Sequence, residues 1–125
     1  MTSLWGPIPA TVEVKPPVAI LGEQANEITA QTRGVIRGHV DKTARDGRLY
    51  YELSLNAPAL DNYYIAILTI VNGIDLYPAT IRDHIHDREL QCGDEGQLID
   101  SLGQVLGSPE VSRIVASLLS QSKAA

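Results

Sequence analysis

Residues 63–73 read YYIAILTIVNG, and this stretch decides the predicted fold. Apart from Thr69, both sets of alternating side chains between residues 65 and 71 are apolar. One set is Ile65, Ile67 and Val71, and the other is Ala66, Leu68 and Ile70. A strand that is apolar on both sides is typical of the centre of a sheet covered on both faces. Asn72-Gly73 then predicts a type I′ hairpin turn, in which both residues take positive φ.

Three further strands are predicted around this one. Residues 35–42 place Ile36 and Val40 on one face, residues 49–56 alternate in the same way, and residues 74–82 follow the turn at Asn72-Gly73. Asp46-Gly47 predicts a hairpin between the first two strands. Pro78 lacks a backbone N–H, so the fourth strand is expected at the edge of the sheet. The expected sheet is a four-stranded antiparallel meander.

Apolar side chains spaced three and four residues apart predict three helices. The first begins at Pro16-Pro17 and ends at Arg33-Gly34, the second follows Gly93-Asp94-Glu95, and the third follows Ser108-Pro109-Glu110. The predicted fold class is therefore α+β, with one N-terminal helix, four strands and two C-terminal helices. Residues 17–119 form the single predicted domain. Residues 1–16, here called the arm, are expected to be extended, and residues 120–125 form a flexible tail.

Composition and charge exclude several classes of function. The chain has 125 residues, the size of one domain, and a formal net charge of −5. An acidic chain is not expected to bind nucleic acid or an anionic membrane surface, because both need clustered Lys and Arg. The longest apolar stretch, residues 65–71, is too short to span a bilayer, and residues 1–7 do not resemble a signal peptide. With Cys92 as the only cysteine no internal disulfide can form, and a cytoplasmic location is predicted.

Residues 83–92 hold the chemical groups that most invite a functional interpretation. His84, His86 and Cys92 are candidate metal ligands, because imidazole and thiolate bind zinc and a His-x-His pair in extended chain puts both rings on one side. Cys92 could also be a nucleophile with His84 or His86 as its base. No Cys-x-x-Cys or His-Glu-x-x-His motif supports either reading. A solvated polar connection is favoured, and no metal, cofactor or catalytic residue is predicted.

The tyrosine-rich strands favour an interaction surface. Its predicted members share one alternation set and carry aromatic or charged side chains, which are Arg37, His39, Tyr50, Glu52 and Tyr64. Tyrosine is enriched at protein interfaces because it combines a large apolar face with a hydrogen-bonding tip. The leading hypothesis is a non-enzymatic protein-interaction or accessory module. The alternatives are a metal-binding protein or metal-dependent enzyme using residues 83–92, and a small-molecule-binding domain with its pocket between sheet and helices.

Size, acidity and element order are similar, at the coarsest level, to those of small accessory proteins such as immunity proteins and secretion chaperones, although no motif identifies a family. Self-association is also expected. Three helices cover only one sheet face, so an apolar second face around residues 63–71 would be exposed and would favour a homodimer. In the alternative, the arm folds back over that face through Trp5, Ile8, Val12 and Val14 and completes a monomer.

Overall fold

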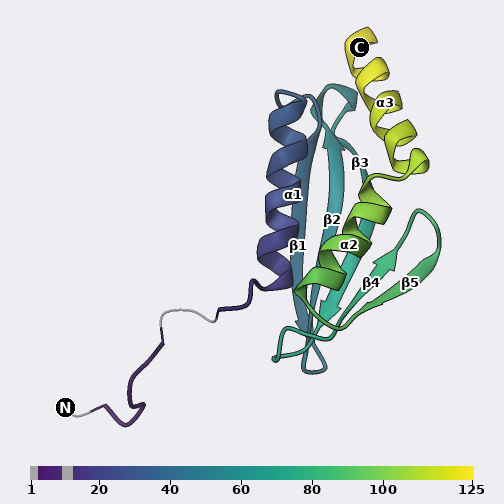
Figure 1. Ribbon diagram of the computed structural model, residues 1–125. Helices are drawn as coiled ribbons and strands as arrows, with labels where there is room; N and C mark the ends of the chain where they lie inside the picture. The colour runs from purple at the N-terminus through teal and green to yellow at the C-terminus, as the bar shows by residue number, and fades with distance from the viewer. Residues whose placement is uncertain (1–2, 10–12) are drawn as a thin grey trace.

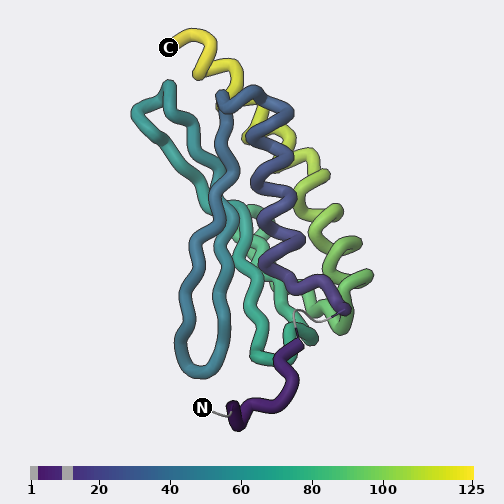
Figure 2. Tube along the Cα trace, turned by 90° about the vertical axis from the view of Figure 1, so that its left-hand side faces the viewer, coloured from purple at the N-terminus to yellow at the C-terminus, as the bar shows by residue number. Residues whose placement is uncertain are grey.

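The protein is a single antiparallel sheet with a layer of three helices on one side. The computed structural model describes residues 3–9 and 13–125. The strands are β1 (Arg37–Arg45), β2 (Arg48–Ala57), β3 (Tyr63–Asn72), β4 (Ala79–Asp83) and β5 (Arg88–Cys92), and they are neighbours in sequence order. Helices α1 (Pro17–Gln31), α2 (Glu95–Leu106) and α3 (Pro109–Ala124) lie on the same face of this sheet (Figures 1 and 2). The predicted α+β class is confirmed.

The prediction of four strands is wrong, because residues 83–92 form a hairpin rather than a connection. Strand β5 pairs with β4 from Asp83 opposite Arg88 to Ala79 opposite Cys92. Only two residues of β5, Leu90 and Cys92, are apolar and pack against the core, and the other three are polar. A five-residue strand with two apolar side chains at an exposed edge gives too short an alternation to be recognised in the sequence.

The turn predicted at Asn72-Gly73 is also wrong. Strand β3 ends at Asn72 and β4 begins at Ala79, so residues 73–78 form a longer loop and Pro78 precedes the strand that was expected to contain it. Asn72 is 3% exposed and lies opposite both Leu49 and Ala79, inside the sheet. The other predicted hairpin is confirmed, since Asp46 and Gly47 both have positive φ between Arg45 and Arg48.

A β-bulge decides which side chains of β3 face the helices. The register of β2 and β3 shifts between Leu53 and Ser54, so that Leu53 lies opposite Leu68 but Ser54 lies opposite Ala66. The extra residue is Ile67, which joins Leu68 on the helix side, and both are fully buried. The predicted second apolar face of β3 is therefore wrong. Tyr64, Ala66, Thr69 and Val71 are left on the opposite side, in register with polar residues of β2.

The packing of α1 on β1 depends on a glycine. A Cβ added at Gly38 would lie 2.5 Å from Cα and 2.8 Å from the carbonyl carbon of Ala25, so only glycine permits this approach. The Gly38 N–H donates to Thr29 Oγ1, and that hydroxyl donates in turn to the Ala25 carbonyl. The Thr29 hydroxyl thus forms hydrogen bonds with a backbone N–H of β1 and a backbone carbonyl of α1 at the point where the two elements touch.

The helix ends agree with the sequence signals. Pro16 and Pro17 begin α1, and Gly34 with φ of 79° follows its end. Asp94 and Ser108 cap α2 and α3, each accepting a backbone N–H three residues later. Helix α3 continues to Ala124, so residues 120–124 of the predicted tail are helical here. No helix in the described part of the chain has the length and apolar character needed to cross a membrane.

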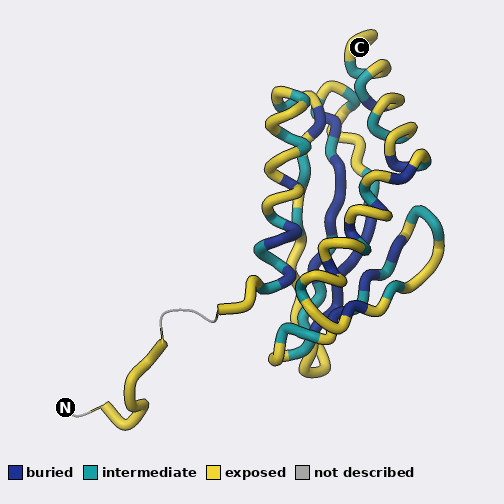
Figure 3. Tube along the Cα trace, in the orientation of Figure 1, coloured by how far each residue is buried: buried dark blue, intermediate teal, exposed yellow. Residues whose placement is uncertain are grey.

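The described part of the arm does not touch either face of the sheet. Residues 3–9 run away from the domain (Figures 1 and 3), and Leu4, Trp5 and Ile8 are 96%, 84% and 76% exposed. Val12, another predicted anchor, lies outside the described residues. Lys15 is where the arm meets the domain, because its N–H donates to Glu95 Oε1 and its carbonyl accepts from the Tyr77 hydroxyl.

Truncating the centre of the core should destabilise the protein strongly. Leu53 is 2% exposed and Ile67 is fully buried, as expected from the sequence. Each change to Ala should lower the free energy of unfolding by about 2–5 kcal/mol, since it removes apolar contacts and leaves a cavity. Urea unfolding measures this, with the 88% exposed Ile74→Ala as control. Losses below ~1 kcal/mol for both core variants would contradict the assigned inner face.

Replacing Gly38, at the contact of α1 with β1, and Gly22, within α1, by alanine should change the stability of the protein in opposite directions. Gly38→Ala forces a methyl group into the Ala25 backbone and should destabilise by about 1–3 kcal/mol. Gly22→Ala, with no heavy atom within 4 Å, should stabilise by about 0.5–1 kcal/mol through the higher helix propensity of alanine. Thermal unfolding of both variants compares them. An unchanged midpoint for Gly38→Ala would mean that α1 sits farther from β1 than described.

Candidate functional site

The residues predicted as an interaction surface all lie on the sheet face away from the helices, here called the open face. Gly38 contacts α1, so its neighbours Arg37 and His39 point to the other side. Tyr51 is in the core, which directs Tyr50 and Glu52 outward. Tyr63 lines a hollow with residues of α3, so Tyr64 also faces outward and is 57% exposed. Among the described residues no helix covers this face (Figure 2).

Tyr50 lies on this face near the β1–β2 hairpin, together with two arginines that the sequence did not single out. The Arg45 guanidinium lies 4.3 Å from the centre of the Tyr50 ring, and that of Arg82 lies 5.7 Å from it. Cations over an aromatic face are attracted by its electron-rich surface. The three residues come from β1, β2 and β4, so only the sheet register could have revealed this Arg–Tyr–Arg stack.

Charges of both signs surround the stack in a shallow hollow of about 460 Å³. Asp41 and Glu52 lie opposite each other on β1 and β2, while Thr69 and His84 form the far wall. His39 Nε2 lies 3.0 Å from Asp41 Oδ1, but both side chains are more than half exposed. An exposed ion pair of this kind adds little stability. The hollow is therefore open to solvent and lined mostly by polar and charged side chains.

The three candidate metal ligands do not converge. His84 Nε2 is 2.8 Å from the Thr69 hydroxyl on the open face, whereas Cys92 is buried under the helices and His86 lies at the tip of the β4–β5 hairpin. Within residues 3–9 and 13–125, no three His, Cys, Asp or Glu side chains are grouped so that they could hold a metal ion. Burial raises the pKa of the Cys92 thiol, which disfavours the reactive thiolate.

Asp83 organises the β4–β5 hairpin. Its side chain has no solvent exposure and accepts the backbone N–H groups of Ile85 and His86, each at 3.0 Å. It also lies 2.6 Å from His86 Nδ1 and 3.1 Å from Arg88 Nε. Burial by itself would raise the pKa of Asp83, but the hydrogen bonds from His86 and Arg88 outweigh it and hold the pKa below its usual value. The carboxylate is therefore a buried, charged anchor.

His86 joins this hairpin to α3. Its Nε2 lies 2.9 Å from Glu110 Oε1 in the first turn of α3, so both ring nitrogens face carboxylates. Two ring nitrogens can donate together only in the charged imidazolium. The bonds to Asp83 and Glu110 raise the pKa of His86 accordingly. Because neither nitrogen is free to take a proton from a substrate, Asp83, His86 and Glu110 form a structural bridge rather than an acid–base centre.

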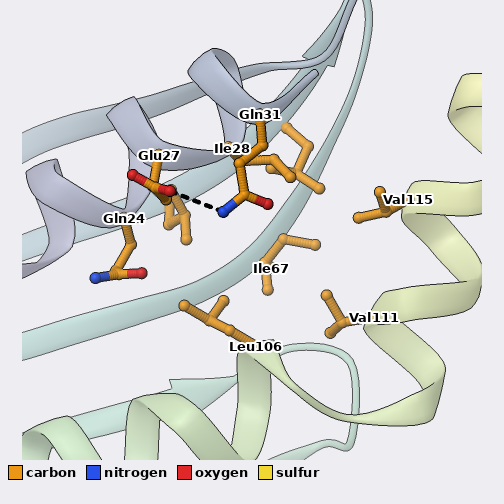
Figure 4. A pocket seen from close by; sticks show the side chains of 10 residues that line it. Gln24, Glu27, Ile28, Gln31, Ile67, Leu106, Val111 and Val115 are labelled. Carbon is orange, nitrogen blue, oxygen red and sulfur yellow. Dashed lines mark hydrogen bonds between the residues drawn. The ribbon is translucent and has the colours of Figure 1, made fainter. Parts of the chain in front are cut away.

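The helix layer leaves a groove above the sheet, and the sequence did not predict which helices form its walls. A hollow of about 220 Å³ lies between α1 and α3 with Leu53, Leu55 and Ile67 as its floor. Figure 4 shows Val111 and Val115 of α3 facing Ile28 and the polar side chains of α1 across it. Helical spacing predicts which face of each helix is apolar but not how far apart two helices pack, so a gap between them gives no sequence signal.

Comparison of the chain with protein-family models, with curated proteins and with solved structures gives no match.

The bridge through His86 should make stability depend on pH in a defined direction. The pKa of His86 is raised in the fold, so its contribution is complete below the unfolded value of 6.5 and is lost as pH rises through the folded pKa. The contribution of Asp83, whose pKa is lowered, is instead present above 3.8 and lost as pH falls through its folded pKa. Both groups are therefore charged together in mildly acidic solution.

Thermal unfolding of the native protein and of His86→Gln should show this window. The difference between their midpoints should be largest near about pH 5 and should shrink toward about pH 9, where the native histidine is neutral. His39→Gln, which removes an exposed ring on the open face, is the control and should differ little from the native protein at either pH. A difference for His86→Gln that is constant with pH would show that the bridge does not depend on the imidazolium.

Proposed function

We propose that this protein is a non-enzymatic interaction module that binds another protein through the open face of its sheet. The observation that carries the proposal is the Arg–Tyr–Arg stack, with guanidinium groups 4.3 Å and 5.7 Å from the Tyr50 ring on a face without a helical cover among the described residues. Tyrosine and arginine are the side chains that most often dominate the binding energy of protein interfaces.

The electrostatics of this face favour a protein partner of mixed charge. Arg37, Arg45 and Arg82 contribute positive charge, while Asp41 and Glu52 contribute negative charge on the neighbouring rungs of the sheet. Complementary charges set orientation and association rate at such a surface. The alternation of signs and the net charge of −5 disfavour nucleic acid and anionic lipid. With its single buried cysteine, the module suits the reducing cytoplasm.

A second copy of the chain is the partner that we propose first. A face carrying both signs of charge can match itself across a two-fold axis, and such isologous dimers are the commonest assemblies. The reason differs from the one that the sequence offered, because the open face is polar rather than apolar. The proposed contact joins the stack of one copy to Asp41 and Glu52 of the other.

A second candidate function is supported by the groove between α1 and α3. It lies between sheet and helices, where a small-molecule pocket was expected, and its floor is apolar. Its volume of about 220 Å³ falls below the range of roughly 300–1,000 Å³ that is usual for ligand pockets. The groove thus fits one or two side chains of a peptide better than it fits a compact ligand. Metal chemistry at residues 83–92 has less support, because the described residues keep its three candidate ligands apart.

Sedimentation equilibrium tests the proposed partner. The native chain should sediment at twice 13.5 kDa at tens of micromolar concentration, and Tyr50→Ala and Arg82→Ala should each weaken association by roughly 30-fold, the effect of losing a 2 kcal/mol hot spot. Gln104→Ala, an exposed change on α2, is the matched control and should leave association unchanged.

A native mass of 13.5 kDa under these conditions would exclude the second copy as partner. Capture from the native host, followed by affinity measurement on the purified partner, then tests the open face with the same three variants. If a captured partner binds Tyr50→Ala and Arg82→Ala as tightly as the native protein, the open face is not the binding surface.

A further inference from the structure

The groove between α1 and α3 continues along α1 toward the arm. A second hollow of about 310 Å³ lies between α1 and α2, with Ile20, Ile99 and Leu102 among its apolar residues and Lys15 at its end. Gln24 and Leu106 line both hollows, so the two lie next to each other along α1, and together they are here called the helix groove. An elongated groove with an apolar floor has the shape for an extended segment of chain.

Residues 3–9 are an extended segment whose apolar side chains lie in solvent. Leu4, Trp5 and Ile8 are the most exposed large apolar residues of the described chain apart from Ile74, and Trp5 is the only tryptophan. A buried aromatic side chain hides about 150–250 Å² from water. The described residues therefore include both an apolar groove and an extended segment with three exposed apolar side chains.

The point of attachment puts this segment within reach of the groove. Lys15 lines the groove and is fixed there by its hydrogen bonds to Glu95 and Tyr77, at 2.8 Å and 2.9 Å. Trp5 stands ten residues before it in the sequence, a distance of up to roughly 33 Å in extended chain. From Lys15, the far end of the groove near Gln31 lies only about 24 Å along the helix axis at 1.5 Å per residue. The arm can reverse direction and still bring Trp5 to the hollow over Ile67.

We propose that residues 3–9 bind in the helix groove of their own chain, with the Trp5 side chain in the hollow between α1 and α3. Gln24 and Glu27 on the α1 side of that hollow supply oxygens for the indole N–H, which needs a partner when the ring is buried (Figure 4). Pro7 and Pro9 have no backbone N–H, so docking leaves fewer donors to satisfy. A short tether gives the segment of the same chain a high effective concentration, which favours it over a second copy.

The fluorescence of Trp5 tests this proposal directly, because no other tryptophan contributes. In the native chain, emission should be shifted to the blue and acrylamide quenching should be several-fold weaker than in a synthetic peptide of residues 1–14. Val115→Glu and Ile28→Gln place polar groups in the groove and should return both signals to the values of the peptide. Ile74→Glu, on an exposed loop outside the groove, should leave them unchanged.

Circular dichroism establishes that each variant is folded, and Ile28→Gln, a milder change than Val115→Glu, provides a second groove variant. Quenching of native Trp5 at the rate of the free peptide would overturn the proposal, and this measurement needs no variant. A blue shift that appears only as the protein concentration rises would assign the groove to the arm of a second copy and would also overturn it. Tyr50→Ala should not change the signal, so failure here is distinguishable from failure of the open-face interface.

Discussion

The β-bulge at Ile67 is the constraint on which the arrangement of both faces depends. Side chains alternate along a regular strand, so residues 65–71 without a bulge would present apolar groups on both sides of the sheet. The extra residue places Ile67 and Leu68 on the helix side together, while Ser54 and Ala66 meet on the other. Three helices then cover the apolar side, and the opposite side carries mainly polar and aromatic groups, with Ala66 and Val71 among them. An antiparallel sheet of this kind can face water on one side at no cost to its core.

The sequence predicted the elements that regular spacing or local turn chemistry defines. The three helices, their caps at Asp94 and Ser108, and the hairpin at Asp46-Gly47 follow from residues within four positions of one another. The bulge could not be predicted, since YYIAILT reads equally well as a regular strand and only the pairing with Leu53 and Ser54 reveals the extra residue. The Asn72-Gly73 signal was misleading because tertiary pairing of Asn72 inside the sheet overrode the local turn preference.

The candidate sites also divide into features that local sequence predicts and features that only tertiary contacts reveal. All five residues expected on the interaction surface do share one face, because alternation within each strand is a local property. Arg45 and Arg82 were missed because they meet Tyr50 only after four strands, β1 to β4, have paired. The sequence singled out residues 83–92 for their polar groups, but it did not predict that Asp83 and His86 connect the β4–β5 hairpin to α3. Asp83, His86 and Arg88 are close in sequence, but the second partner of His86 is Glu110, which α3 brings from 24 positions away. That bridge fixes the outer hairpin to the last helix, where few apolar contacts are available.

The Arg–Tyr–Arg stack on the open face adds little to the stability of the fold. Polar side chains on a solvated sheet face gain little from one another, and an arginine held in one position gives up roughly 2 kcal/mol of rotamer entropy. A cation over an aromatic ring at an exposed site contributes about 0.5–1 kcal/mol, which is less than this entropy cost. The stack of Arg45, Tyr50 and Arg82 is therefore not expected to stabilise the fold. Its consequence is pre-organisation, since side chains already confined lose less entropy when a partner binds. The helix side differs in kind, because its groove exposes apolar groups that any occupant would remove from water. Under the two proposals, the open face would take a polar protein surface and the groove an apolar segment of chain.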